Sequence, residues 1–239
     1  SAALNLKDMF IAADFTASQK ASTTALITAL ESIISGQRHH LMVAASDRRE
    51  TRAADFYEMW FGYGAAALTV GDSDVIAEYK GSCSVSHEFV DHYRGANKKY
   101  DYVWEERWAR DAGYGRIIPE VVNGLLAKLG LTIADVDKLV YPCVFKRDHG
   151  NIARQLGAAP ETLVDNMHEV CGETGTAHPF IMFISALERA RPGDRVVIVG
   201  FGQGANALLF EVNRARIGIA LGDVAANREA ISRSLDRLA

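Results

Sequence analysis

The feature that most constrains the fold of this chain is a regular alternation of two kinds of segment. In one kind, apolar residues recur at helical spacing; the other kind is a short apolar run. Residues 20–35 place apolar side chains three and four positions apart, and Gly36 follows them as a stop signal. Residues 40–45 form a short apolar run that fits a buried strand and ends at the polar residues 46–49. Helix and strand in alternation predict an α/β fold.

The same alternation continues along the chain. Further strands are predicted at 63–70, 137–141, 194–199 and 207–212, and further helices at 117–129, 149–156 and 178–189. The last two strands are joined by a tight glycine loop, 201–204. This loop leads into a strand, so no helix N-terminus is available to hold a pyrophosphate. The sequence therefore argues against a nicotinamide site there.

The stretch from residue 78 to residue 115 differs from the rest of the chain in its residue pattern, because aromatic and charged residues are interleaved in it. Residues 91–94 and the aromatic cluster 100–108 stand out. We expect an excursion from the fold that covers a tunnel mouth, meets a partner through Trp, Tyr and Arg, or packs as a plain insertion.

Charge and cysteine content narrow the class of partner. With 26 Lys and Arg against 30 Asp and Glu, the net charge of −4 gives no reason to expect nucleic acid or an anionic membrane. No apolar run reaches the roughly 18 residues of a spanning helix, and no signal pattern opens the chain. The three cysteines lie far apart, which suggests neither disulfides nor a metal site. We expect a cytoplasmic protein that binds small ligands or proteins.

Four blocks carry a family resemblance, in matching order and with matching gaps. They are residues 12–26, the helix end 35–36, residues 172–177 and residues 191–204. Together they resemble the HMG-CoA synthase and ketoacyl synthase III branch of the thiolase superfamily. The resemblance implies a layered α-β-α-β-α fold, dimers, and acyl chains carried on coenzyme A or a carrier protein. A coenzyme A thioester is the expected ligand, with no covalently bound cofactor.

The resemblance also divides the chain. Residues 1–77 would be the remainder of an N-terminal thiolase-like half, 78–115 the excursion, 116–220 the C-terminal half and 221–239 a helical tail or linker. The family carries roughly one hundred residues before its nucleophile helix, about the size of a small domain. Because this chain opens at Ser1 without such a segment, we expect that the first part of the N-terminal half is absent from it.

Three chemical positions of the family fall on residues that cannot do the family's chemistry. Its nucleophilic cysteine, at the start of a buried helix, corresponds to Gln19, and an amide cannot form a thioester. The neighbouring Ser18 is turned away by about 100° on a helix and would not inherit the role. The family's histidine and asparagine correspond to Pro142 and Glu173. We expect the covalent step and the carbonyl polarisation to be lost together.

Other side chains could border the same pocket. Cys143 or Cys171 could replace the nucleophile, although a buried free cysteine is more commonly inert. His178 begins a buried helix next to the pocket loop, where it could polarise a carbonyl or simply pack. The remaining histidines of interest, His39, His40 and His149, are predicted to lie at the surface or in turns.

The pocket has two further candidate features. Gly202 and Gly204 would let the loop 201–204 approach the former nucleophile position closely. Lys146 and Arg147 could meet the phosphates of coenzyme A, or lie in a solvated turn.

Three functions remain open. In the first, the chain is a non-nucleophilic subunit of an acyltransferase complex, as a homodimer or with a thiolase-type subunit, and sometimes with a small zinc-ribbon/OB-fold protein. In the second, Glu173 acts as acid or base in a non-covalent decarboxylation, retro-aldol or retro-Claisen reaction of an acyl-CoA, since glutamine also replaces the cysteine in decarboxylating ketoacyl synthases. In the third, the chain only binds acyl-CoA. We favour the first, because a carboxylate in a pocket is only a probabilistic sign of catalysis.

Overall fold

Helices and strands alternate along the chain, as the sequence predicts. The structure, a computed structural model, describes residues 11–213. Its longer elements are α1 (Ala21–Ile34), β1 (His40–Arg48), β2 (Tyr63–Gly71), β3 (Ala77–Ser86), α3 (Gly115–Leu129), β6 (Lys138–Val140), α4 (Lys146–Leu156), α6 (His178–Arg189), β7 (Arg195–Phe201) and β8 (Gly204–Val212). The short elements are η2 (Phe56–Met59), β4 (His92–Tyr93), β5 (Tyr102–Val103), α2 (Glu106–Trp108), the π-helical η3 (Ala109–Tyr114), η4 (Ile133–Asp135), η5 (Pro160–Thr162), α5 (His168–Cys171) and η6 (Gly175–Ala177).

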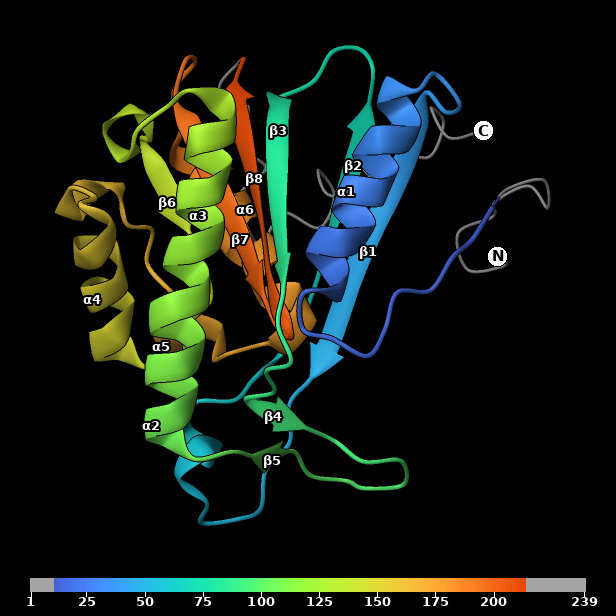
Figure 1. The fold of residues 1–239 in the computed structure, drawn as a ribbon. Coiled ribbons are helices and arrows are strands. Elements are labelled where there is room, and N and C mark those ends of the chain that lie inside the picture. Colours follow the sequence, from blue (N-terminus) through green and yellow to red (C-terminus); the bar gives the residue numbers. More distant parts are fainter. Residues whose placement is uncertain (1–10, 214–239) are drawn as a thin grey trace.

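The elements form layers (Figure 1). Helices α1 and α6 lie between a four-stranded sheet and the two-stranded ladder β1–β2, and they contact both. Helix α3 covers the opposite face of the four-stranded sheet, and α4 packs beside α3. The order α-β-α-β follows the layering that the sequence predicts, and the α/β class is confirmed.

The four-stranded sheet has the order β3-β8-β7-β6. Strands β6 and β7 are parallel, and the chain crosses between them through α4 and α6. Strands β7 and β8 are antiparallel and are joined by the predicted glycine loop. Because β7 is buried on both faces, its sequence reads as one apolar run.

Side chains of β7 divide the apolar core into two parts. Val197 and Val199 belong to the cluster beneath α3, whereas Val196 and Ile198 belong to the cluster that includes α1 and α6. Alternate residues of a strand point to opposite faces, so one strand supplies both clusters.

Three boundaries differ from the sequence prediction. Residues 78–86, assigned to the excursion, belong to β3, an edge strand whose partner is β8. Its exposed face alternates with a half-buried one, which hides the strand among polar residues. Strand β1 continues through the polar residues to Arg48, because Asp47 and Arg48 still pair with β2. Helix α4 begins at Lys146, so residues 146–148, read as a turn, form its first turn.

The prediction for His149 is also wrong. It is only 6% exposed, and its ring lies 4.7 Å from the ring of Tyr141. The earlier helix start places it on the inward side of α4. Burial lowers the pKa of His149 to about 4, so the ring is neutral near pH 7. His39 and His40 lie outside the core as predicted, and the tail 221–239 lies outside the described residues.

Helix α1 and the central strands approach so closely that no side chain fits between them at Gly200. A Cβ there would lie 2.1 Å from Oγ1 of Thr23. That hydroxyl donates to the carbonyl oxygen of Lys20 at 2.9 Å and accepts from Nδ2 of Asn206 at 3.2 Å. Asn206, 3% exposed, also donates to Oγ1 of Thr24 at 2.9 Å. Hydrogen bonds from Asn206 to Thr23 and Thr24 therefore hold the start of α1 against β8.

Gly200→Ala is expected to destabilise the fold by about 1–3 kcal/mol, because the added methyl overpacks this contact. Gly150→Ala is the matched control, since a Cβ at that helical position meets nothing within 4 Å. The control should be neutral or more stable by up to about 1 kcal/mol. Urea unfolding followed by circular dichroism measures both. Equal effects of the two variants would contradict the proposed close contact.

Candidate functional site

The segment that leads into α1 lies against the loop between β7 and β8. A Cβ on Gly202 would lie 2.9 Å from the backbone nitrogen of Gln19, so only glycine permits this approach. Oγ of Ser18 donates to the carbonyl oxygen of Gly202 at 2.8 Å. Nε2 of Gln19 is buried and has no hydrogen-bond partner within the described residues. The position predicted to correspond to the nucleophile thus holds a buried carboxamide, and its backbone lies against the glycine loop.

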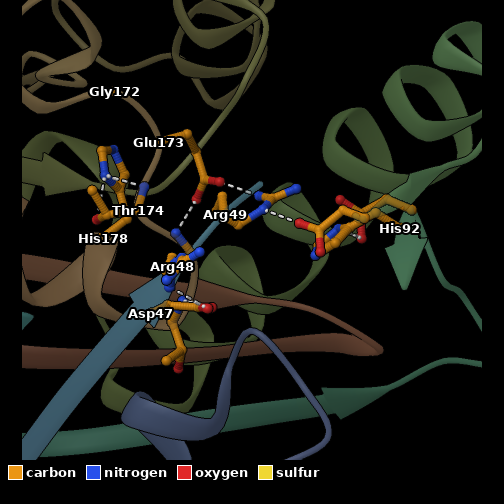
Figure 2. Close-up of polar contacts among 12 residues, drawn as sticks. Asp47, Arg48, Arg49, His92, Gly172, Glu173, Thr174 and His178 are labelled. Carbon is orange, nitrogen blue, oxygen red and sulfur yellow. Dashed lines mark hydrogen bonds and ion pairs between the residues drawn. The ribbon is translucent and has the colours of Figure 1, made fainter. Parts of the chain in front are cut away.

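Glu173 lies at the centre of a buried ion-pair network. Its Oε2 accepts from Nη1 of Arg49, and its Oε1 accepts from the backbone N–H of Gly175 at 2.9 Å. Nε of Arg49 donates in turn to Oδ2 of Asp101 at 2.8 Å. Figure 2 shows Arg49 facing Glu173 on one side, with His92 beyond it on the other. Glu173 and Arg49 are only 3% and 5% exposed, so their charges neutralise each other away from solvent.

The backbone also fixes Glu173 in place. Its N–H donates to the carbonyl oxygen of Trp60 at 2.6 Å, and its own carbonyl accepts from the N–H of Gly62 at 2.9 Å. The ring of Phe61, between those two residues, lies 3.8 Å from the guanidinium carbon of Arg49. This cation–π contact and the two bridging hydrogen bonds hold the 60–62 segment, Arg49 and Glu173 as one unit.

Electrostatics keep Glu173 ionised. Burial alone would raise the pKa of its carboxyl, but the guanidinium of Arg49 outweighs burial, and the pKa lies below the usual glutamate value. The pKa of Arg49 is raised, since its two carboxylate partners outweigh its own burial. A carboxyl that remains a carboxylate at neutral pH cannot donate a proton there.

The network continues to the excursion and back to β1. Oδ1 of Asp101 lies 3.5 Å from Nη1 of Arg94, and Nη2 of Arg94 lies 3.7 Å from Oδ1 of Asp47. Oδ2 of Asp47 accepts from the N–H of Thr176 at 3.2 Å. Ion pairs and hydrogen bonds therefore link three segments: the end of β1, the excursion and the loop that follows Glu173.

His178 is fully buried, and both of its ring nitrogens have partners. Nε2 lies 2.8 Å from the carbonyl oxygen of Asn166, while Nδ1 accepts from the N–H of Thr174 at 3.4 Å. Burial lowers the pKa of His178, so the ring is neutral. This bonding fixes the first turn of α6 and leaves no ring nitrogen for a substrate.

The residues after β6 are buried rather than open to a pocket. Cys143 is 0% exposed, Pro142 is also buried, and burial raises the pKa of the Cys143 thiol to about 12. Cys171 is half-buried, and burial raises its pKa as well. Neither thiol has the lowered pKa of a reactive cysteine.

The phosphate candidates lie at the surface. Lys146 is exposed at the start of α4 and forms an ion pair with Glu169, and Arg147 is exposed beside it. Gly204 takes a positive φ of 103° and lies against Val85.

Space around the buried network is small. The cavity next to Arg49 and Asp91 measures about 10 Å³, close to the least that admits one water molecule. A larger hollow of about 260 Å³ lies elsewhere and includes none of the predicted site residues; it is lined by Arg110, Asp111, Gly115, Asp148, Asn151, Ile152 and Gln155. Within residues 11–213, no three His, Cys, Asp or Glu side chains are placed to hold a metal ion, and no helix is long and apolar enough to cross a bilayer.

Sequence reasoning missed Arg49 and Asp101. Arg49 stands at the end of a polar run that reads as the close of a strand, and its partners lie 52 and 124 positions away. The available signal was the pair of acidic residues, Asp91 and Asp101, within an excursion that otherwise contributes exposed aromatic rings.

Comparisons with known proteins agree with the resemblance. Residues 126–211 match the family described as 3-oxoacyl-[acyl-carrier-protein (ACP)] synthase III C terminal. The chain is 30% identical over 203 residues to a hydroxymethylglutaryl-CoA synthase of Thermococcus onnurineus, covering 84% of this chain and 58% of that protein. It is 28% identical over 211 residues to the Methanopyrus kandleri protein of the same name, covering 88% of this chain and 60% of the relative.

Solved structures show the same fold. The crystal structure of 3-oxoacyl-[acyl-carrier-protein] synthase III from Aquifex aeolicus matches with a TM-score of 0.73 at 19% identity, covering 85% of this chain and 68% of that one. MvaS in complex with 3-hydroxy-3-methylglutaryl coenzyme A matches with a TM-score of 0.75 at 17% identity, covering 99% and 69%. The chain spans about three fifths of the length of the curated relatives it matches.

Arg49→Met should destabilise the protein by about 3–5 kcal/mol, because Glu173 and Asp101 would remain buried without their counter-charge. Arg38→Met is the control, since Arg38 is exposed and bonds to the neighbouring carbonyl of Gln37. Chemical denaturation at pH 7 gives both values. A cost for Arg49→Met no larger than for Arg38→Met would contradict the buried network.

The pH dependence of the destabilisation by Arg49→Met is a second test of the ion pair between Arg49 and Glu173. In the native protein the lowered pKa of Glu173 adds stability above its unfolded pKa of about 4.3, which is lost as pH falls through the folded pKa. In Arg49→Met, the guanidinium no longer offsets the burial of Glu173, so its pKa rises and stability is lost as pH rises above the unfolded value. The cost of the substitution should therefore be smaller at pH 5 than at pH 8.

Proposed function

The chain belongs to the thiolase superfamily, in the branch of HMG-CoA synthase and ketoacyl synthase III, and we propose that it acts in acyl-CoA metabolism as a subunit without covalent chemistry of its own. The proposed partner is a thiolase-type subunit that supplies the nucleophile. The proposed role of this chain is to support that subunit and to contact its substrate.

The observation that carries the proposal is Gln19 at the entry to α1. A helix N-terminus favours a thiolate and the negative charge of a tetrahedral intermediate, but only when a nucleophile stands there. The carboxamide of Gln19 cannot form a thioester, and Ser18 is committed to the carbonyl of Gly202. The buried Cys143 does not supply a replacement thiolate, given its raised pKa.

Non-covalent catalysis by Glu173 is the second candidate and is less well supported. Each carboxylate oxygen already has a partner, and the pKa of the group lies below the usual range. General acid–base work favours a pKa near the working pH. A lowered pKa makes Glu173 a weak base, and its ionisation removes the acid role.

A coenzyme A thioester is the proposed ligand of the assembly. HMG-CoA synthase has been solved with CoA and MvaS with 3-hydroxy-3-methylglutaryl coenzyme A, and both share this fold. A small zinc-ribbon/OB-fold protein is a proposed further companion, a cytoplasmic location is proposed for the complex, and simple acyl-CoA binding without a catalytic partner ranks third.

The proposal is tested with acetyl-CoA and intact-mass spectrometry. The native chain should gain no acyl adduct, alone or with the proteins encoded next to it. Gln19→Cys is the positive control, since its thiol would stand at the N-terminal end of α1 and report whether the thioester reaches that position. An acyl group trapped on any side chain of the native chain would contradict the proposal.

Turnover separates the two candidate functions. The proposed subunit role requires that turnover of acyl-CoA thioesters depends on a second subunit and survives Glu173→Gln. Turnover by the isolated chain that Glu173→Gln abolishes, in a variant that circular dichroism shows to be folded, would instead support the non-covalent enzyme.

A further inference from the structure

Residues 167–172 form a strap that contains α5 and leads directly into Glu173. Both ends of α5 take left-handed backbone angles, with φ of 56° at Met167 and 69° at Gly172. Glycine adopts a positive φ freely, but methionine does so only where neighbouring contacts compensate for the strain. The path of the strap therefore depends on the contacts that its side chains make.

The ring of His168 supplies contacts between the strap and the body of the protein. Its centroid lies 5.3 Å from that of His178 on α6 and 6.1 Å from that of Trp60. Nδ1 of His168 lies 3.3 Å from Nδ2 of Asn166. Asn166 is buried, and its carbonyl oxygen lies 2.8 Å from Nε2 of the buried His178. His168 thus joins the strap to the first turn of α6.

A proton added to this cluster would find no acceptor in the described part of the chain. Nε2 of His168 is buried without a hydrogen-bond partner there, and the same holds for Nε2 of His149 and Nε1 of Trp60. A buried N–H⁺ that lacks an acceptor is strongly unfavourable. Protonation of His168 therefore favours any conformation that brings its ring into water.

The charged and titratable groups near His168 are already engaged. They are His178, Glu173, His149 and Asp165, in order of their effect on it, together with the Glu169–Lys146 ion pair between the strap and α4. Glu173 is paired with Arg49, and Asp165 accepts from the N–H of Met167 at 2.7 Å. The two other histidines would repel a protonated His168 if they also gained a proton.

The direction of the pH effect follows from the pKa of each ring. Burial, and next the neighbouring His178, lower the pKa of His168 to about 4. Burial likewise lowers the pKa of His149 to about 4, and it lowers that of His178. A histidine in water has a pKa of about 6.5. Between these two values the open strap binds more protons than the closed one, so the closed state loses stability as the pH falls through that range.

We propose that protonation of His168 releases the strap from the body of the protein and thereby loosens the loop that carries Glu173. The end of the strap explains this coupling. A Cβ on Gly172 would lie 2.9 Å from the backbone nitrogen of Gly62, so the two segments are in close contact. The next residue, Glu173, is hydrogen-bonded through its backbone to Trp60 and Gly62. Release of the strap therefore removes a support of the Glu173 backbone.

Hydrogen exchange of the strap amides in the full chain tests the proposal. The N–H groups of Val170, Cys171 and Gly172 bond to carbonyl oxygens within the strap, so they exchange when it opens. From pH 8 to pH 5, after correction for the intrinsic exchange rate, the open population should rise roughly thirtyfold, as the two pKa values of His168 require. At both pH values the strap should exchange faster than β7, whose amides report global unfolding.

Two substitutions separate His168 from the other histidines. His168→Gln removes the titrating ring and should leave the corrected exchange of the strap nearly independent of pH. His39→Gln is the matched control, because the side chain of His39 is 74% exposed just before β1, and it should leave the thirtyfold rise unchanged. Circular dichroism at pH 8 checks that both variants are folded.

An NMR titration of His168 in the native chain gives a readout that needs no variant. We expect a pKa well below the value of about 6.5 for a histidine in water. A pKa at or above that value would overturn the proposal. So would an equal rise in strap exchange for His168→Gln and the native chain, or strap exchange that coincides with that of β7 at every pH.

Discussion

A single buried guanidinium joins the parts of this protein that surround Glu173. Arg49 binds Glu173 on one side and Asp101 on the other, and its face covers the ring of Phe61. Removing two carboxylates from water is unfavourable unless each has a counter-charge and further hydrogen bonds. The end of β1, the excursion and the loop before α6 therefore stay together as long as Arg49 remains in place.

This arrangement gives Glu173 a structural role, as the ion-pair partner of Arg49. The resemblance predicts a neutral asparagine at this position, whereas a buried carboxylate requires a counter-charge. Here the cation is Arg49, which directly follows β1, and the cavity next to Arg49 measures about 10 Å³. Gln19 has a buried amide nitrogen, and Glu173 is paired with Arg49, so both positions hold packed side chains where the family resemblance predicts a reactive pocket.

The excursion is connected to the same ion-pair network. Through Asp101 it shares Arg49 with Glu173, and through Phe89 and Trp108 it rests on the strand that leads to Gly202. The side chains of Phe89 and Asp101 are buried, whereas the rings of Tyr93, Tyr102 and Trp104 face solvent. The part of the chain that departs most from the α/β alternation thus carries a row of exposed aromatic rings, and it is anchored by Arg49 and by Phe201.

The sequence by itself determined the α/β class, the positions of α1, α6 and β7, the glycine loop beside Gln19 and the family resemblance, because periodicity, glycine stops and ordered motifs are local properties of a chain. The resemblance also predicted that Gln19 and Glu173 stand where the family has a cysteine and an asparagine. Only the tertiary structure decided that Glu173 is bound by Arg49, that His149 is buried and that residues 77–86 form an edge strand. Each of these depends on a partner distant in sequence, and the pairing of buried charges is a property of the packed chain that no local pattern encodes.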